Sequence, residues 1–504
     1  MDYAPVKLKR AERPLALAID IGTSSTRARV YDALGTPVSR LAHQVRYAMK
    51  TTQDGGVFIE PEHIARATEE CIDQVLDEAG KDATDVKAVG MDTFWHSLLG
   101  VDRKGHPTTA LINWADTRPR SVIPLLKQKL NPREVHQRTG CYIHPSYWPA
   151  KLLWLSRHDR SAFRRTGRWL SIGEYLFQSF LGNAISSVSM ASGTGLFQQN
   201  ECSWDETLLG HLPVTPDQLP ELGDFDTPLR GLRRPYRRRW PSLTGVPWFP
   251  AVGDGASSNA GSGCTRETQL CMVMGTSSAM RILKEASRIE IPEGLWVYRV
   301  DKKRFLVGGA LSEGGNVRKW LVHQQRMPSG KEGIAAALSA TPPDEHKLTI
   351  LPFLAGERST GWHENADGVI AGLNLDTTRK ELIRAMMESI GYRFAAIYEI
   401  VRKQAVPIQQ IIASGGGFVD SAAVTQLMAD ILGSRVTQSA EAEGSARGSA
   451  VLALEAIGAI TDLSVLPVPA GPSFEPDRKN HAIYREARKR QEGLYELMAR
   501  EWWS

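Results

Sequence analysis

The stretch LALAIDIGTSSTRARVYD (residues 15–32) contains two runs with the residue pattern of β-strands, Leu15–Asp20 and Thr26–Tyr31, joined by the turn GTSS. Strand patterns on both sides of a small turn predict a paired strand unit. The same four letters return about half a chain later, inside LCMVMGTSSAMRIL (residues 270–283). The repeat predicts two lobes of similar build, each with a hydroxyl-rich turn between two strands.

The rest of each half alternates strand and helix patterns. In the first half, a helix with apolar residues at helical spacing begins near Pro61, and strand patterns follow it at Lys87–Asp92 and Ser97–Asp102. In the second half, RFLVGGAL predicts a strand, TRKE at Thr378 begins a long helix with capping-box spacing, and the strand QQIIAS runs into GGG and another helix. This alternation predicts an α/β fold with a cleft between two domains, residues 1–248 and 249–504.

The composition is that of a soluble globular protein: 504 residues, 42% hydrophobic, 23% charged, net charge +5. This mild charge suits a small anionic substrate and does not favour nucleic acid. The densest basic run, Arg233–Arg239, is interpreted as a solvated surface loop. Five scattered cysteines without metal-site spacing favour reduced thiols and a cytoplasmic location. No apolar run reaches the length of a membrane helix, and the polar N-terminus is unlike a signal peptide.

A glycine followed by hydroxyl residues can direct backbone N–H and side-chain O–H groups at one point, which attracts phosphate. A single GTSS is more readily a plain hairpin turn without a ligand, but two such turns facing each other across a cleft predict a polyphosphate site. Asp20, two residues before the first turn, is placed to hold Mg²⁺. The P-loop motif is absent from the sequence. The predicted phosphate-binding residues are Thr23, Ser24, Ser25, Gly275, Thr276 and Ser277.

Longer motifs occur in a fixed order along almost the whole chain from Leu15 to the final helix. They are AIDIGTSSTRARVYD, GMDTFWHSLLGVD, INWADTRP, FPAVGDGASSNAG, VMGTSSAMRI, LPFLAGERSTGW, GVIAGLNLDTTRKELIRAMMESIGY and IASGGGFVDSAAVTQLMADIL. Together they resemble the FGGY carbohydrate kinases. The resemblance implies an ATP-dependent sugar kinase with two actin-like, ribonuclease-H-like domains that close over the substrates, with Mg²⁺ as the metal and the two turns around the ATP phosphates.

The resemblance also implies roles for single residues. Asp254, in AVGDGASSN, matches the catalytic aspartate that takes the proton of the attacking hydroxyl; without the resemblance, a helix cap is an equal reading. Further residues are implied to lie along the nucleotide, in glycine-rich turns that allow close backbone approach: Gly309, Ser312, Asn316, Gly416, Gly417 and Ser421.

The sugar is expected to bind to the first domain. Trp95 and His96 stand where many family members have a Met-His pair, and NWADTRP supplies Trp114, Asp116 and Arg118, an aromatic ring, a carboxylate and a guanidinium suited to a polyol. Alternatives stay open: Trp114 can be a core residue, and Asp116 with Arg118 can be a structural ion pair.

Several stretches most resemble bacterial gluconokinases, which implies phosphorylation of D-gluconate to 6-phosphogluconate. Candidates for binding the substrate carboxylate are Arg118, His144 and Lys151. Family members commonly carry Gln-Met where this chain has Phe94-Trp95. A bulky Trp there changes the size of the pocket, so a pentulose, D-xylulose or D-ribulose, stays the alternative substrate. A more distant alternative is an actin-like ATPase without sugar kinase activity. The sequence leaves a homodimer open.

Overall fold

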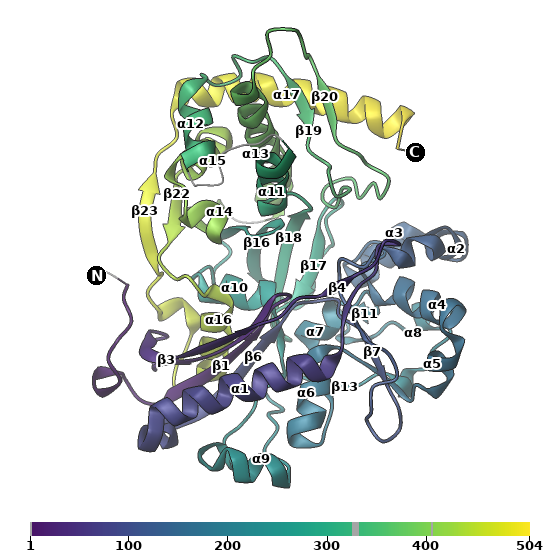
Figure 1. Ribbon diagram of the computed structural model, residues 1–504, viewed down its shortest axis with the longest axis vertical. Coiled ribbons are helices and arrows are strands. Elements are labelled where there is room, and N and C mark those ends of the chain that lie inside the picture. The colour runs from purple at the N-terminus through teal and green to yellow at the C-terminus, as the bar shows by residue number, and fades with distance from the viewer. Residues whose placement is uncertain (1–2, 325–331, 405–406, 504) are drawn as a thin grey trace.

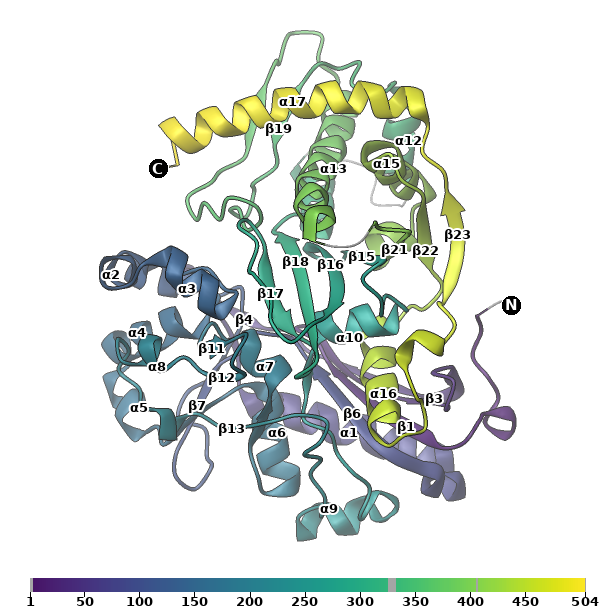
Figure 2. The ribbon, with the colours of Figure 1, turned by 180° about the vertical axis from the view of Figure 1, so that it is seen from behind.

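The computed structural model describes residues 3–324, 332–404 and 407–503. Its two halves form two lobes, each built on a β-sheet (Figure 1). The helices α10 (Asp254–Gly261) and α16 (Gly444–Ala456) lie where the lobes meet, as the reverse view also shows (Figure 2). No helix within the described ranges is both long and apolar enough to cross a membrane.

The sheet of the first lobe has five strands in the order β14-β6-β1-β2-β3. Its strands are β1 (Leu15–Ile21), β2 (Ser25–Tyr31), β3 (Pro37–Arg46), β6 (Val86–Thr93) and β14 (Val252–Gly253). The strands β1, β2 and β3 form an antiparallel meander, whereas β6 and β14 run parallel to β1. The first GTSS turn therefore joins β1 to β2. Since β14 belongs to this sheet, the sheets divide the chain after Gly253; the boundary at residue 248 stays a prediction.

The second lobe repeats this order within a sheet of seven strands, β17-β18-β16-β15-β21-β22-β23. Its strands are β15 (Gln269–Met274), β16 (Ser278–Glu285), β17 (Trp296–Arg299), β18 (Arg304–Leu311), β21 (Gln410–Ser414), β22 (Val436–Ser439) and β23 (Ala470–Phe474). An antiparallel meander is again followed by two parallel strands, β21 and β22, beside the first strand. The second GTSS turn joins β15 to β16, so both turns occupy the same place in two similar sheets.

Helices cover the sheets and build the cores. The helix α1 (Pro61–Ala79) packs on β2 and β3, with Ile64, Cys71 and Ile72 fully buried at the predicted helical spacing. On the other face, α10 and α16 pack on each other and on the first sheet. Their approach requires glycine: a Cβ on Gly448 would lie 1.8 Å from the carbonyl oxygen of Ser257. The long helix α13 (Arg379–Gln404) packs on β16 and β18, and Thr378 forms the predicted capping box with Glu381.

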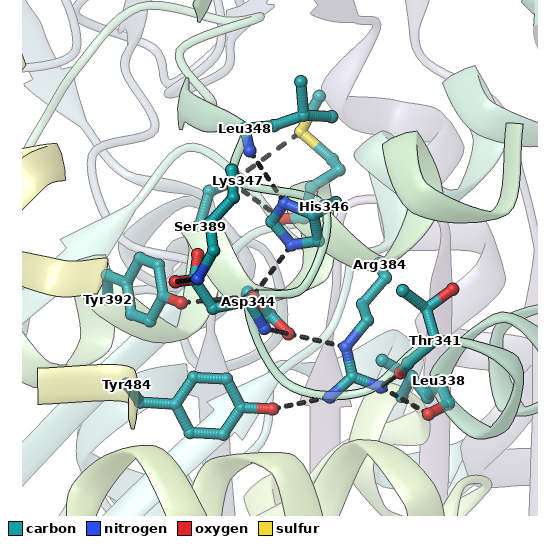
Figure 3. Close-up of polar contacts among 12 residues, drawn as sticks. Leu338, Thr341, Asp344, His346, Lys347, Leu348, Arg384, Ser389, Tyr392 and Tyr484 are labelled. Atoms are coloured by element: carbon teal, nitrogen blue, oxygen red, sulfur yellow. Dashed lines mark hydrogen bonds and ion pairs between the residues drawn. The ribbon is translucent and has the colours of Figure 1, made fainter. Parts of the chain in front are cut away.

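A buried ionic network fixes the C-terminal helix α17 (Arg478–Glu501) to α13 (Figure 3). Glu388 accepts hydrogen bonds from Arg384 Nε at 2.6 Å and from His346 Nε2 at 3.0 Å. Asp344 binds Lys347 at 3.1 Å and also Arg490 of α17. Asp344, His346 and Glu388 are close enough to hold a cation, but side-chain cations already bind both carboxylates. The cluster therefore holds the fold together.

The remaining elements surround these sheets. In the first half they are α2 (Ile123–Lys129), α3 (Pro132–Thr139), α4 (Trp148–His158), α5 (Arg160–Arg165), α6 (Ile172–Leu181), α7 (Val188–Ser192), α8 (Glu206–Leu209), α9 (Arg234–Arg239), β4 (Lys50–Thr51), β5 (Val57–Ile59), β7 (Leu99–Val101), β8 (Leu111–Ile112), β9 (Arg168–Leu170), β10 (Ile185–Ser187), β11 (Phe197–Gln198), β12 (Ser203–Trp204) and β13 (Glu221–Gly223). In the second half they are α11 (Gly315–Gln324), α12 (Glu332–Ala340), α14 (Gly416–Val419), α15 (Ala422–Leu432), β19 (Thr349–Leu351) and β20 (Val369–Ala371).

The basic run Arg233–Arg239 lies on the surface, as predicted, but the prediction of a loop was wrong. It forms α9, whose Arg239 makes ion pairs with Glu69 and Asp73 of α1. Pro235 stands in the first turn, where its missing N–H costs nothing, so it starts the helix instead of interrupting it.

Candidate active site

One cavity of about 390 Å³ lies between the lobes and contains most of the predicted site residues. Both GTSS turns, Asp20, Asp254, Trp95, His96 and Trp114 line it. Its other lining residues are Arg27, Phe94, His144, Ser146, Tyr147, Gly255, Ser258, Val273, Ala279, Arg281, Trp296, Tyr298, Ala310, Arg358, Trp362 and Ser445. Residues from the two halves of the chain thus form a single site.

The two hydroxyl-rich turns are fixed by their own backbones. In the first, the N–H of Gly22 donates to the carbonyl oxygen of Ser25 at 2.9 Å, and in the second the N–H of Gly275 donates to that of Ser277 at 2.9 Å. The hydroxyl of Tyr47 also donates to the carbonyl oxygen of Gly22 at 2.6 Å. Preorganised turns of small residues leave N–H and O–H groups available to an anion in the cavity.

Asp254 begins α10 directly after β14, the last strand of the first sheet. Its Oδ1 accepts a hydrogen bond from the N–H of Gly255 at 2.7 Å. Burial raises the pKa of Asp254 to about 6, while the nearby Arg281 guanidinium lowers it and the Asp20 charge raises it. A carboxylate with this pKa is deprotonated at neutral pH and still basic enough to accept a proton from a hydroxyl.

Asp20 lies at the end of β1 and lines the cavity beside the first turn. Its Oδ2 binds Arg27 at 3.1 Å, and Arg27 also binds Glu443 at 3.1 Å. Asp92, its partner in the β1–β6 register, is fully buried, and neither of its carboxyl oxygens makes a hydrogen bond with a described residue. Burial and the charges of Asp20 and Asp254 raise the pKa of Asp92 well above its usual range, which favours its neutral form.

This donor set fits a hard divalent cation. Mg²⁺ prefers carboxylate oxygens together with phosphate oxygens and water. Asp20 supplies a carboxylate beside the first turn, where phosphates are expected. The residues present are compatible with a magnesium ion near Asp20, which stays a prediction.

Aromatic side chains form another part of the cavity. The indole N–H of Trp95 donates to the carbonyl oxygen of Ser189 at 3.0 Å, and its ring lies 4.8 Å from that of Tyr298, centre to centre. Trp95 also fills the space beside Gly253, where a Cβ would come within 1.8 Å of the indole. Trp114 is half-buried and lines the cavity, so it is not enclosed in the core.

Two neutral histidines with complementary ring nitrogens line the cavity. His96 Nδ1 lies against the carbonyl oxygen of Gly193, which assigns the proton to Nδ1 and leaves Nε2 as an acceptor. His144 Nδ1 accepts from the N–H of Ser146 at 3.2 Å, so Nε2 carries the proton and is a donor. Burial lowers the pKa of both imidazoles to about 3. The pair can accept one hydrogen bond from a polyol and donate another.

Three polar residues predicted near the sugar lie outside the cavity lining. Asp116 has a fully buried side chain, accepts from the N–H of Val57 at 2.9 Å and accepts three hydrogen bonds from the Arg118 guanidinium, two from Nε and one from Nη2. The Arg118 guanidinium also lies 4.6 Å from the ring centre of Trp154. Lys151 is buried and donates to the carbonyl oxygen of His96, and burial lowers the pKa of its amine to about 7. Their roles as substrate ligands stay predictions.

The predicted nucleotide residues also lie outside the cavity lining, and several adjoin the second turn. Asn316 donates from its backbone N–H to the carbonyl oxygen of Thr276 at 3.1 Å and from its side chain to that of Ser312 at 2.9 Å. A Cβ on Gly417 would lie 2.5 Å from Cγ of Met274, the last residue of β15. Gly309 lies in β18 and Ser421 is the N-cap of α15. Contact with a nucleotide stays a prediction for all six.

Three arginines of the cavity, Arg27, Arg281 and Arg358, were not among the predicted site residues. Arg27 and Arg281 follow the two GTSS turns in the quoted motifs, and Arg358 lies in LPFLAGERSTGW. A charged residue in an otherwise apolar strand is the signal that could have indicated Arg281, which is only 5% exposed in β16. Nothing in the sequence pattern alone places Arg358 beside Trp114.

Comparisons with known proteins agree with this architecture. The model of the FGGY family of carbohydrate kinases, N-terminal domain, matches residues 15–261, and that of the C-terminal domain matches residues 270–457. The chain therefore belongs to the FGGY family of carbohydrate kinases. This confirms the resemblance and the two-domain, actin-like fold predicted from the sequence.

The individual relatives include enzymes for different sugars. The gluconokinase of Bacillus subtilis is 26% identical over 91% of this chain and 90% of its own length, and a xylulose kinase of Staphylococcus xylosus is 25% identical over 87% and 90%. Among solved structures, a xylulose kinase and a gluconate kinase, both from Lactobacillus acidophilus, each have a TM-score of 0.89 and 25% identity. The xylulose kinase match covers 99% of this chain and the gluconate kinase match covers 97%; both cover 99% of the matched chain. Sugar kinase activity follows from the family; the sugar does not.

Proposed function

We propose that the protein transfers the γ-phosphoryl group of ATP to a hydroxyl of a sugar acid, D-gluconate, and so forms 6-phosphogluconate. The observation that carries this proposal is the single cavity that joins both hydroxyl-rich turns, Asp20 and Asp254 to a wall of aromatic and histidine side chains. The gluconokinases among its relatives favour gluconate. The equal similarity to a xylulose kinase structure keeps D-xylulose or D-ribulose as the second candidate.

The residues of the chain divide the work. The two turns hold the phosphates of ATP from opposite lobes, with N–H and O–H groups that need no reorganisation during transfer. Asp254 accepts the proton of the attacking hydroxyl while the new P–O bond forms, and Arg281 stabilises the carboxylate before it does so. Asp20 would hold Mg²⁺, which supplies neutralisation of phosphate charge when it is bound.

The sugar is oriented by neutral groups. His96 Nε2 accepts from one substrate hydroxyl and His144 Nε2 donates to another, while the ring of Trp114 packs against the carbon chain. Because these hydrogen bonds come from half-buried rings whose other nitrogens are already bonded to the chain, the hydroxyl to be phosphorylated is positioned beside Asp254. The free cysteines fit a cytoplasmic enzyme.

The test is the substrate profile of the purified protein. With Mg·ATP, we expect D-gluconate to give a higher kcat/KM than D-xylulose, D-ribulose, L-ribulose or glycerol when ADP release is measured, with 6-phosphogluconate identified as the product. A higher kcat/KM for a ketopentose would leave the kinase reaction standing and contradict gluconate. ATP hydrolysis that no sugar or sugar acid stimulates would contradict the kinase reaction itself.

A further inference from the structure

Arg358 is a cation of the cavity with no acidic partner in the described ranges of the chain. Its Nη2 donates to the carbonyl oxygen of Leu311 at 2.8 Å, and its guanidinium carbon lies 5.4 Å from the ring centre of Trp114. Its Nε is buried and makes no hydrogen bond with a described residue. In the described ranges, no carboxylate forms an ion pair with Arg358; the neighbouring Glu357 pairs with Arg393. Nη1, which makes no hydrogen bond with a described residue and is not among the buried atoms, is the donor available to a ligand.

The groups that surround Arg358 do not balance its charge. His96 and His144 are neutral at physiological pH because burial lowers the pKa of each ring to about 3. Glu313 is the nearby acid that the Arg358 charge influences, but burial raises the pKa of its carboxyl to about 8, which favours the neutral form at pH 7. A half-buried cation without a counter-charge is favoured by an anion that binds beside it.

Three other cations near the site are already engaged, and a fourth, Arg281, makes no ion pair with a described residue but lies where its charge lowers the pKa of Asp254. Arg118 is held by Asp116 outside the cavity lining, and Lys151 donates to a backbone oxygen. Arg27 binds Asp20 and Glu443 at the phosphate end. Of the two cavity arginines without an ion pair, Arg281 lies near the proposed base, whereas Arg358 lies over the ring of Trp114 on the proposed sugar side.

We propose that Arg358 binds the carboxylate of the sugar acid and thereby selects sugar acids over neutral polyols and ketoses. This inference rests on the proposed function and replaces Arg118, His144 and Lys151 as the candidates for that contact. A guanidinium presents paired N–H donors that match the two oxygens of a carboxylate. A neutral sugar in the same position leaves the cation uncompensated, so the discrimination comes from the protein's own unpaired charge.

The experiment compares D-gluconate with D-gluconamide, in which a neutral amide replaces the carboxylate at nearly the same size. Binding to the wild-type protein and to Arg358→Gln is measured by calorimetry without ATP, and kcat/KM is measured for both compounds. We expect the wild type to prefer gluconate by at least about tenfold. Arg358→Gln should weaken gluconate binding by about 10- to 100-fold, as expected for a lost charge-assisted hydrogen bond, and change gluconamide binding little.

Two further variants separate charge from fold. Arg358→Lys keeps the charge but not the paired donors, so it should recover part of the preference for gluconate. Arg288→Gln removes an exposed arginine that pairs with Glu201 on the surface, and it should match the wild type. The thermal midpoint of each variant is recorded with the binding data.

The outcomes distinguish the inference from the function. If the wild type phosphorylates gluconate but binds gluconamide equally well, or if Arg358→Gln weakens both compounds by the same factor, Arg358 does not bind the carboxylate and the proposed function stands. If the wild type phosphorylates ketoses and no sugar acid, the proposed function is wrong, and the inference is overturned with it.

Discussion

Replacing Asp254 by Asn removes the proposed base and changes little else. The amide oxygen can still accept the hydrogen bond that Oδ1 receives from the N–H of Gly255 at 2.7 Å, so α10 keeps its first turn. At pH 8, two units above its pKa of about 6, the wild-type carboxylate is about 99% deprotonated. General base catalysis contributes about 10²- to 10⁴-fold, which corresponds to roughly 2.7–5.4 kcal/mol of barrier. We expect kcat to fall by that factor.

The assay is ADP release at saturating Mg·ATP and gluconate, with the KM for ATP measured beside kcat. The matched control is Asp226→Asn, which removes an exposed carboxylate paired with Lys302 at 3.1 Å and should leave kcat and the thermal midpoint unchanged. A kcat within about tenfold of the wild type, in a variant with an unchanged thermal midpoint, would refute the assignment of Asp254 as the base. A large rise in the KM for ATP with an unchanged kcat would assign Asp254 to nucleotide binding.

Three further outcomes are expected. In a pH profile from 4.5 to 8, the kcat/KM for gluconate should fall about tenfold per pH unit below pH 6, because protonated Asp254 cannot accept a proton. The residual kcat/KM of Asp254→Asn should not show this fall. Arg118→Gln should lower the free energy of unfolding by about 3 kcal/mol in urea denaturation, since it leaves Asp116 buried and unpaired. A raised KM for the sugar without loss of stability would instead favour Arg118 as a substrate ligand. Gly417→Ala should raise the KM for ATP several-fold and the KM for the sugar less, because the new Cβ would lie 2.5 Å from Met274 Cγ beside the second turn. Equal changes in both KM values, or no change, would contradict this prediction. The control is Gly493→Ala, where the new Cβ meets open space.

The sequence predicted those parts of the fold that depend on short-range pattern. Strands and helices with clear periodicity, such as β1, β6 and α1, lie close to the predicted ranges because each buries one face against a sheet or helix. The helix α9 was missed since a run of arginines shows no apolar spacing. Tyr236 packs against Phe180 and Arg239 forms ion pairs with α1, and both contacts are distant in sequence.

The site shows the same division between local and distant signals. The turns and Asp254 carry their own motifs, whereas the significance of Arg358 depends on Trp114, which is distant in sequence and reaches it only in the folded chain. Asp116 and Arg118 show the converse. Their spacing allows both a substrate clamp and an ion pair, and only the burial of Asp116 outside the cavity lining favours the ion pair.

The duplicated sheet explains how the proposed base, Asp254, and the two proposed phosphate-binding turns come to line one cavity. Each GTSS turn closes the first hairpin of its sheet, so two copies of one unit, packed through α10 and α16, bring the two turns to a common cavity. Asp254 begins α10, the helix that follows the last strand of the first sheet and contacts β16 of the second. Burial there raises its pKa, while Arg281 of β16 lowers it. The basicity of the proposed catalytic group therefore depends on both lobes, and separating them would change its pKa as well as its position.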